Sequence, residues 1–229
     1  MEVGAIIVCR LDSKRLPGKV LRTARGKPLL WYIISRCQEL KIPENNIIVA
    51  TSARKVDDPI ADYCEQENVR VFRGSADDVA DRIIKCSMAN KLKYFIRVNA
   101  DSPFLEPSLI NHACDVATSS DYEIVTNLYP RTFPYGVSVE LVGTDVFQAA
   151  YEQMSTPEHF EHVTLFFYQN MERFRYYNIT RDGDNLSKIR LTVDTEQDWQ
   201  EFERIVNEVG EQWKSLSYLD AVELYRKEA

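Results

Sequence analysis

Residues 3–21 of the chain read VGAIIVCRLDSKRLPGKVL and join an apolar run to a basic loop. The run 3–9 has the length of a strand and no polar alternation, which is typical of a strand covered on both faces in a parallel sheet. Four cations follow within the next ten residues: Arg10, Lys14, Arg15 and Lys19. The stretch therefore predicts a buried N-terminal strand whose carboxyl end carries positive charge.

Working outward, the first 127 residues alternate between short apolar runs and amphipathic segments. Strands are expected at 46–51, 69–72, 94–98 and 122–127, and helices at 28–40, 56–66, 77–92 and 108–118. This alternation predicts an α/β fold with a doubly wound, mostly parallel sheet and helices on both faces. Ligands bind at the carboxyl ends of the strands in such sheets, so the basic loop lies at the expected binding edge.

The pattern changes after about Tyr129, and the stretch 129–136 (YPRTFPYG) is rich in turn-forming residues. Beyond it, strands are expected at 137–142, 175–179 and 189–193, and helices at 144–154, 158–170, 198–209 and 219–227. No repeat or low-complexity tract divides the chain. We therefore expect a single domain over 1–229, in which about 128–180 forms a small inserted subdomain or dimerisation arm.

The net charge, the lengths of the apolar stretches and the cysteines limit the classes of partner that the protein can bind. The chain has 229 residues and a net charge of -7, so its long-range field disfavours nucleic acid and anionic membrane surfaces. No apolar stretch approaches the ~20 residues that a membrane helix needs. Five widely spaced cysteines without a C-x-x-C motif fit buried thiols in a reducing compartment. These features predict a cytoplasmic protein with small-molecule partners, no nucleic acid and no membrane.

The basic loop suits a phosphate-bearing ligand. Pro17 and Gly18 form a tight turn, and a loop that follows a strand offers unpaired backbone N–H groups to phosphate oxygens. Arginine grips phosphate through two parallel hydrogen bonds, and lysine adds a mobile point charge. The loop is neither a Walker A loop nor G-x-G-x-x-G. A solvated basic surface loop is the alternative, and the position after a buried strand favours phosphate binding.

Two carboxylates end two other apolar stretches, Asp101 in RVNADSPF and Asp194 in KIRLTVDTEQDW. Each alone could be a turn residue or a helix N-cap, and Asp194 stands beside a possible capping box. Mg²⁺ needs only one or two protein carboxylates beside substrate phosphates. Two acids that face a basic loop therefore form a candidate metal site.

In this order, the motifs resemble those of the SpsF-like cytidylyltransferases, which are named for spore coat polysaccharide biosynthesis and belong with the CMP-sialic acid and CMP-Kdo synthetases. S-x-R-L-P-G-K is the most specific match. The matching stretches span nearly the whole chain: RLDSKRLPGKVL, GKPLLWYII, IIVATS, FRGSADDV, IRVNADSPF, FPYGVSVE, EHFEHVT and IRLTVDTEQDW. The resemblance implies a nucleotidyltransferase (GT-A-like) fold and a homodimer. It also implies transfer of CMP from CTP to a hydroxyl of an acidic sugar or related acceptor, with release of pyrophosphate, in surface polysaccharide biosynthesis.

The resemblance also assigns site residues. It implies catalytic roles for Arg15, Lys19 and Asp101, and Mg²⁺ ligation by Asp101 and Asp194. Acceptor binding is implied for Tyr135, Glu140, Glu161 and His162. Nucleotide binding is implied for Cys9, Arg10, Ser13, Arg15, Leu16, Gly18, Lys19, Ala50, Thr51, Ser52, Arg73, Ser75, Asn99 and Ala100.

Two positions on the acceptor side depart from the pattern of the family. Many members carry an acid where this chain has Ser138, and an arginine where it has Phe160. Two other functions stay open. One is a GT-A-like glycosyltransferase that uses a nucleotide sugar, although the chain has NADSP where such enzymes usually carry D-x-D. The other is a non-catalytic nucleotide-binding protein of a polysaccharide pathway.

Overall fold

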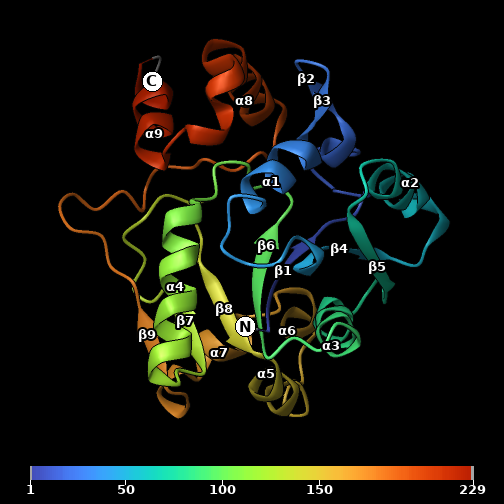
Figure 1. Cartoon of the computed structure of the whole chain (residues 1–229), viewed down its shortest axis with the longest axis vertical. Helices are drawn as coiled ribbons and strands as arrows, with labels where there is room; N and C mark the ends of the chain where they lie inside the picture. Colours follow the sequence, from blue (N-terminus) through green and yellow to red (C-terminus); the bar gives the residue numbers. More distant parts are fainter. Residues whose placement is uncertain (1, 228–229) are drawn as a thin grey trace.

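The computed structural model describes residues 2–227, and its strands form one large sheet and one small hairpin (Figure 1). The strands are β1 (Val3–Val8), β2 (Thr23–Ala24), β3 (Lys27–Pro28), β4 (Ile47–Ser52), β5 (Arg70–Gly74), β6 (Tyr94–Asn99), β7 (Ile124–Thr126), β8 (Glu140–Gly143) and β9 (Tyr176–Asn178). The large sheet has the order β5-β4-β1-β6-β8-β7-β9. Its strands are parallel except β8, which runs antiparallel to β6 and β7. The mostly parallel sheet is confirmed.

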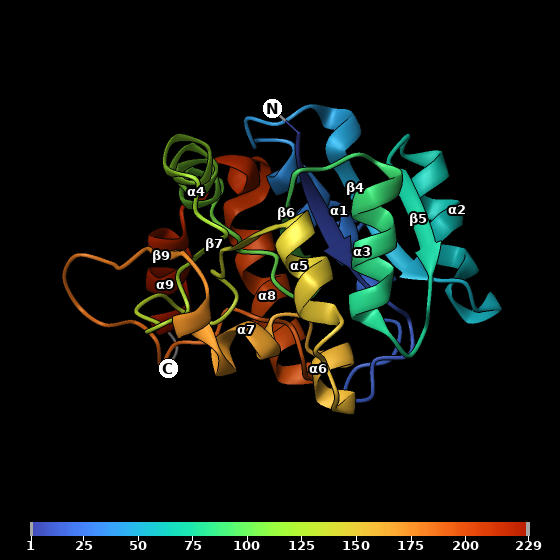
Figure 2. The ribbon, with the colours of Figure 1, turned by 90° about the horizontal axis from the view of Figure 1, so that it is seen from below.

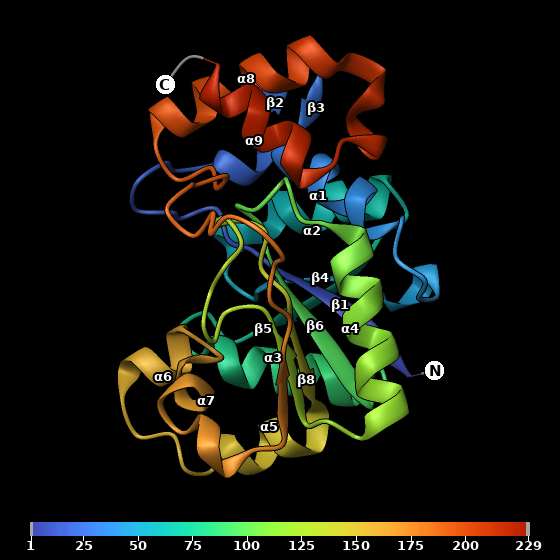
Figure 3. The same cartoon turned by 90° about the vertical axis from the view of Figure 1, so that its left-hand side faces the viewer.

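The helices cover both faces of this sheet. They are α1 (Leu29–Cys37), α2 (Asp58–Gln66), α3 (Val79–Ala89), α4 (Pro107–Ser120), α5 (Thr144–Tyr151), α6 (Pro157–Glu161), α7 (Leu165–Gln169), α8 (Glu196–Val209) and α9 (Tyr218–Arg226). Figure 3 shows α8 and α9 on one side, with α3, α5, α6 and α7 on the other. In Figure 2, α3 and α5 lie side by side on the second face. The doubly wound arrangement is confirmed.

Strand β1 explains why the opening run has no polar alternation. Val3, Ala5 and Ile7 pack into the core that α1, α2, α4, α8 and α9 cover. Ile6 points the other way, into the core formed with α3, α5 and α7. Since side chains alternate across a strand, both sets must be apolar when both faces are covered.

The helix predicted over 158–170 is wrong as a continuous element, because it breaks at 162–164 into α6 and α7. His162 leaves helical geometry with φ -99° and ψ 52°. Beyond the break, the hydroxyls of Thr164 and Tyr168 both donate to the buried carboxylate of Glu140 in β8. Two hydrogen bonds to a charged group outweigh the modest helix propensity of a few residues.

The strand predicted at 189–193 is also wrong. Among residues 2–227, the backbone pairing of this stretch is a single isolated β-bridge between Arg190 and Tyr135. Tyr135 donates its N–H to Ile189 O and accepts from Leu191 N, at 2.9 and 2.8 Å. The next residue, Gly136, has φ +94°, and a Cβ there would lie 2.8 Å from Leu191 O, so this close approach requires glycine.

The strand predicted at 137–142 begins only at Glu140, as β8, because the Asn127 side chain donates to Val137 O and accepts from Val139 N, both at 2.8 Å. The segment 128–180 contributes β8 and β9 to the main sheet and α5, α6 and α7 to one of its faces. The segment is therefore built into the main sheet and the core that the sheet supports.

Candidate functional site

A cavity of about 790 Å³ opens at the carboxyl ends of β1 and β6. Val8 stands opposite Asn99 in the parallel register, so the loop after β1 lies beside the loop after β6. Side chains of both signs line the cavity, and the cations outnumber the carboxylates by seven to five: Arg10, Lys14, Arg15, Lys19, Arg54, Arg82 and Arg97 against Asp12, Asp77, Asp101, Glu161 and Asp194. Positive charge in excess, within a chain of net charge -7, suits an anionic ligand.

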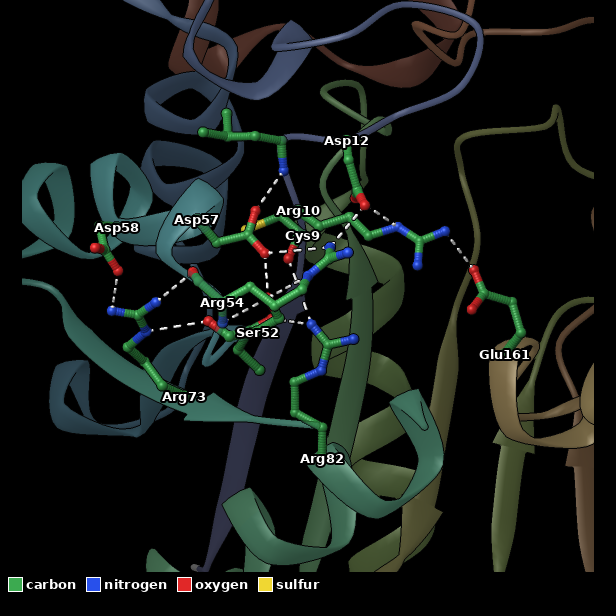
Figure 4. A network of polar contacts seen from close by, with 12 residues as sticks. Cys9, Arg10, Asp12, Ser52, Arg54, Asp57, Asp58, Arg73, Arg82 and Glu161 are labelled. Carbon is green, nitrogen blue, oxygen red and sulfur yellow. Dashed lines mark hydrogen bonds and ion pairs between the residues drawn. The ribbon is translucent and has the colours of Figure 1, made fainter. Parts of the chain in front are cut away.

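The loop after β1 is held in shape from both ends. Gly18 has φ +72°, which disfavours any side chain, and its N–H donates to Leu11 O at 2.8 Å. At the other end, the fully buried carboxylate of Asp57 accepts from Leu11 N at 2.7 Å and from the Ser52 hydroxyl (Figure 4). Asp57 therefore ties the basic loop to the end of β4.

Lys19 connects the two acids that the sequence singles out. Its side chain is 91% buried, and its Nζ donates to Val193 O at 2.8 Å. The same ammonium lies 3.0 Å from Asp194 Oδ1 and 3.4 Å from Asp101 Oδ2. A buried ammonium needs such acceptors on every side, so this lysine fixes the distance between the two carboxylates.

Asp194 is the acceptor for three cations. Oδ1 pairs with Lys19 and with Arg15 at 2.9 Å, and Oδ2 pairs with Arg190 at 2.9 Å. Burial by itself would raise the pKa of the Asp194 carboxyl. The hydrogen bond from Lys19 and the charges of Lys19, Arg15 and Arg190 outweigh burial, so the pKa lies below its ordinary value. Asp194 is therefore ionised and orients the basic loop.

Asp101 is the carboxylate that fits a divalent cation better. Its side chain is 29% exposed in the cavity, and Ser102 donates to Oδ1 at 3.0 Å. Both oxygens of Asp194, in contrast, already bind cations of the protein. No group of three or more His, Cys, Asp or Glu able to hold a metal occurs within residues 2–227. A metal here would complete its coordination with oxygens of the substrate, as Mg²⁺ commonly does.

Arg10 and Glu161 face each other across the cavity, and Arg10 Nη2 lies 2.8 Å from Glu161 Oε1 (Figure 4). Asp12 pairs with Arg10 at 3.3 Å and with Arg54 at 2.7 Å. These ion pairs are partly exposed, so each is weak and can exchange for a ligand of higher charge. The cations at the rim are thus available to an incoming polyanion.

The structure gathers most, but not all, of the expected site residues around the cavity. Those that line it are Cys9, Arg10, Ser13, Arg15, Lys19, Asn99, Ala100, Asp101, Glu161, His162 and Asp194. Those that lie outside its lining are Leu16, Gly18, Ala50, Thr51, Ser52, Arg73, Ser75, Tyr135 and Glu140.

Several residues outside the lining support it. Arg73 donates to Ser52 O and Arg54 O and pairs with Asp58, so its guanidinium fixes the backbone after β4 (Figure 4). Glu140 is 98% buried and pairs with Arg97 Nη1 at 2.7 Å. Glu140 therefore holds Arg97, which lines the cavity.

The sequence contained a signal for Arg82 and Arg97, which were not expected in the site. Arg82 occupies a buried position on the apolar face of α3, and Arg97 interrupts the apolar strand YFIRV. The Nε of each has no hydrogen-bond partner among residues 2–227. Burial lowers the pKa of Arg82, whose Nη1 reaches only Cys9 O and Ala50 O at 3.5 and 3.4 Å. In both cases, an arginine within an otherwise apolar stretch of sequence lies in the wall of the cavity.

Comparison with known proteins gives consistent matches along the chain. The family model described as cytidylyltransferase matches residues 4–223. The spore coat polysaccharide biosynthesis protein SpsF of Bacillus subtilis (strain 168) is 30% identical over 213 residues, which cover 90% of this chain and 87% of that protein. No helix within residues 2–227 is long and apolar enough to span a membrane.

Solved structures of similar proteins agree with the sequence matches. A cytidylyltransferase from Leptospira borgpetersenii serovar Hardjo-bovis (strain JB197) superposes with a TM-score of 0.92 at 26% identity, over 100% of this chain and 95% of that one. The CMP:2-keto-3-deoxy-manno-octonic acid synthetase complexed with CTP has a TM-score of 0.65 at 17% identity. The match covers 91% of this chain and 99% of the synthetase chain, so the two proteins share the fold.

Proposed function

Because the chain belongs to the cytidylyltransferase family, we propose that it transfers CMP from CTP to a hydroxyl of an acidic sugar or a related acceptor, in surface polysaccharide biosynthesis. The observation that carries this proposal is the excess of cations over carboxylates in the cavity at the ends of β1 and β6. A nucleoside triphosphate carries several negative charges, which suits such a wall. A structural relative with the same fold was solved with CTP.

In the proposed reaction, Arg10, Arg15 and Lys19 hold the triphosphate. The acceptor hydroxyl gives up its proton to solvent and its oxygen forms a new bond to the α-phosphorus, the bond from that phosphorus to the bridging oxygen breaks, and pyrophosphate leaves. Charge spreads over phosphoryl oxygens in such transfers, so preorganised cations supply much of the rate enhancement. Asp194 keeps Arg15 and Lys19 in place before the nucleotide arrives.

We propose that Asp101 is the principal ligand of a divalent metal, with Mg²⁺ as the physiological ion. When bound, Mg²⁺ neutralises phosphate charge and polarises the phosphoryl group. The exposed position of Asp101 at the cavity supports this role. For Asp194 to join it, Arg15 or Arg190 must first move from the carboxylate to the phosphates.

Pyrophosphate release tests the proposal. Release that requires CTP, Mg²⁺ and an acceptor would support it, whereas release of a free nucleoside diphosphate from a nucleotide sugar would indicate a glycosyltransferase. Asp101→Asn is expected to lower the turnover number at least about a hundredfold, because it weakens stabilisation of the transition state. Asp115→Asn, at an exposed position of α4, is the matched control. An active and normally folded Asp101→Asn protein would refute the metal assignment.

We further propose that the chain works as a cytoplasmic homodimer joined through the segment 128–180. Three tyrosines in this segment, Tyr129, Tyr176 and Tyr177, are 37–41% exposed, and β9 is an edge strand of the sheet. Exposed aromatic side chains are enriched at protein interfaces. Five buried free cysteines support a reducing compartment. Sedimentation equilibrium of the wild type and of Tyr176→Glu tests the dimer, and a monomeric wild type at micromolar concentration would contradict it.

A further inference from the structure

Arg190 is a cation that the fold holds against Asp194. Its Nη2 donates to Asp194 Oδ2 at 2.9 Å and to Thr192 Oγ1 at 3.1 Å. Its guanidinium carbon lies 5.4 Å from the centre of the Tyr135 ring, and the backbones of Arg190 and Tyr135 form a β-bridge. Arg190 lies outside the lining of the cavity. A carboxylate, a hydroxyl and an aromatic ring therefore keep this half-exposed guanidinium in place behind Asp194.

Arg15, the other arginine that pairs with Asp194, is held less firmly. Its side chain is 63% exposed and lines the cavity, and its Nη2 lies 2.9 Å from Asp194 Oδ1. It makes no second ion pair with residues 2–227. A single exposed ion pair is weak, so moving Arg15 to the phosphates of a nucleotide costs little. Arg190 and the buried Lys19 remain on the carboxylate when Arg15 has moved.

The charges around the two acids decide how many divalent ions the site attracts. Asp101 and Asp194 carry two negative charges, and Lys19 and Arg190 carry two positive charges in direct contact with them. These four groups sum to zero without Arg15. Oxygen sites bind divalent ions more tightly when more of their carboxylate charge is uncompensated. Phosphates supply that charge for one ion at Asp101, whereas a second ion at Asp194 would meet a carboxylate that is already neutralised.

We propose that Arg190 is a positioning residue that takes the place of a second divalent ion at Asp194, so that a single ion, at Asp101, serves each active site. This inference rests on the proposed transfer of CMP and on Asp101 as the metal ligand. Asp194 then acts through the protein's own cations, and its carboxylate keeps Lys19 beside Asp101. Loss of the charge of Arg190 leaves two carboxylates against one ammonium, which creates a second site for a divalent ion.

The first test needs no nucleotide and measures the affinity of the protein for Mn²⁺ by electron paramagnetic resonance. Arg190→Gln is expected to bind Mn²⁺ at least about tenfold more tightly than the wild type, because a repelling charge is lost beside Asp194. Arg190→Lys keeps the charge and is expected to match the wild type. Lys188→Gln, at an exposed position of the same stretch, is the matched control. Equal affinities of Arg190→Gln and the wild type would overturn the inference.

The second test counts the ions in the complex with CTP, in the absence of an acceptor. The protein is kept in excess over CTP, so that all of the nucleotide is bound. One Mn²⁺ per bound CTP is expected in the wild type and in Arg190→Lys, and two are expected in Arg190→Gln. A merely structural role of Arg190 would lower the melting temperature of Arg190→Gln without adding an ion. Two ions in the wild type would overturn the inference, and this result requires no variant.

The outcomes separate this inference from the proposed function. If the wild type releases pyrophosphate from CTP but binds two ions with it, the inference is overturned and the transfer of CMP stands. If CTP neither raises the melting temperature nor releases pyrophosphate, the proposed function fails. The Mn²⁺ affinities of the wild type and Arg190→Gln without nucleotide then still decide whether Arg190 keeps a divalent ion from Asp194.

Discussion

Asp194 shows how the position of a single residue can follow from the sequence while its ion pairs do not. The sequence predicts an acid that faces the basic loop, and the structure places it there, 3.0 Å from Lys19 and 2.9 Å from Arg15. The same contacts leave it little room for a metal. Cations from two segments decide this, the loop after β1 with Arg15 and Lys19 and the stretch with Arg190, and no local pattern brings the loop to Asp194.

Asp194→Asn is expected to destabilise the protein by about 3 kcal/mol at pH 7, because it leaves the buried ammonium of Lys19 without its nearest counter-ion. The pKa of Asp194 is depressed below its ordinary value of 3.8, so its stabilising effect is present above that pH and is lost as the pH falls through the folded-state pKa. Urea denaturation at several pH values checks this. The difference between wild type and variant should stay constant above about pH 5 and narrow below pH 4. A difference that does not depend on pH would contradict the ion-pair explanation.

At the scale of elements, the loop after β1 depends on backbone geometry as well as charge. Gly18 and Gly26 have nearly equal positive φ angles, +72° and +71°, and a Cβ would meet nothing within 4 Å at either position. The two glycines differ in location, because Gly18 starts the turn beside Lys19 and Gly26 lies between β2 and β3. They form a natural matched pair.

Gly18→Ala and Gly26→Ala are each expected to cost about 1–2 kcal/mol of stability, since both force alanine into the left-handed region. Only Gly18→Ala is expected to raise the KM for CTP, about tenfold or more, because it shifts the cations that hold the phosphates. Urea denaturation and pyrophosphate release measure the two effects. An equal rise in KM in both variants would show that stability, and not loop geometry, is responsible.

Asp57 and Asp58 are a second pair, at the start of α2. Asp57 is fully buried and holds Leu11 N and Ser52, whereas Asp58 is 46% exposed and pairs with Arg73. Asp57→Asn is expected to cost about 2 kcal/mol and to weaken CTP binding, and Asp58→Asn less than about 1 kcal/mol. Thermal shifts with and without CTP check both. Unaltered CTP binding by Asp57→Asn would exclude a role of Asp57 in positioning the loop.

At the scale of the whole molecule, two cores share one sheet. Trp199 and Trp213 are buried in the core on the α1 and α8 face, and Trp31 packs against it. Phe95 and Phe147 form an edge-to-face pair in the other core, with ring centres 5.1 Å apart. The segment 128–180 supplies Phe147, so we expect it to unfold together with the rest of the chain.

Phe95→Ala is expected to cost about 3–5 kcal/mol, as deletion of a buried aromatic ring commonly does. Because the tryptophans report the opposite face, their fluorescence should shift to the same lower urea midpoint as circular dichroism. Met88→Ala, at a 54% exposed position, is the control and should change stability by less than about 0.5 kcal/mol. Two separate transitions would mean that the segment 128–180 folds as an independent unit.

Periodicity and local chemistry in the sequence determine the strands of the central sheet, the helices on its two faces, and the edge at which the basic loop lies. They do so because an apolar run, a helical stripe or a Pro-Gly turn each constrains its own residues. The sequence also carries the motifs of the cytidylyltransferase family and the acids Asp101 and Asp194.

Only the tertiary structure decided how distant residues share charge. It turned the expected strand 189–193 into a partner of Tyr135, broke the expected helix 158–170 at His162, and buried Glu140 against Arg97. It also set the guanidinium of Arg131 against the neutral oxygens of Pro134 and Ser138. These outcomes depend on electrostatic and hydrogen-bond balance among segments far apart in the chain, and that balance exists only once the segments have packed together.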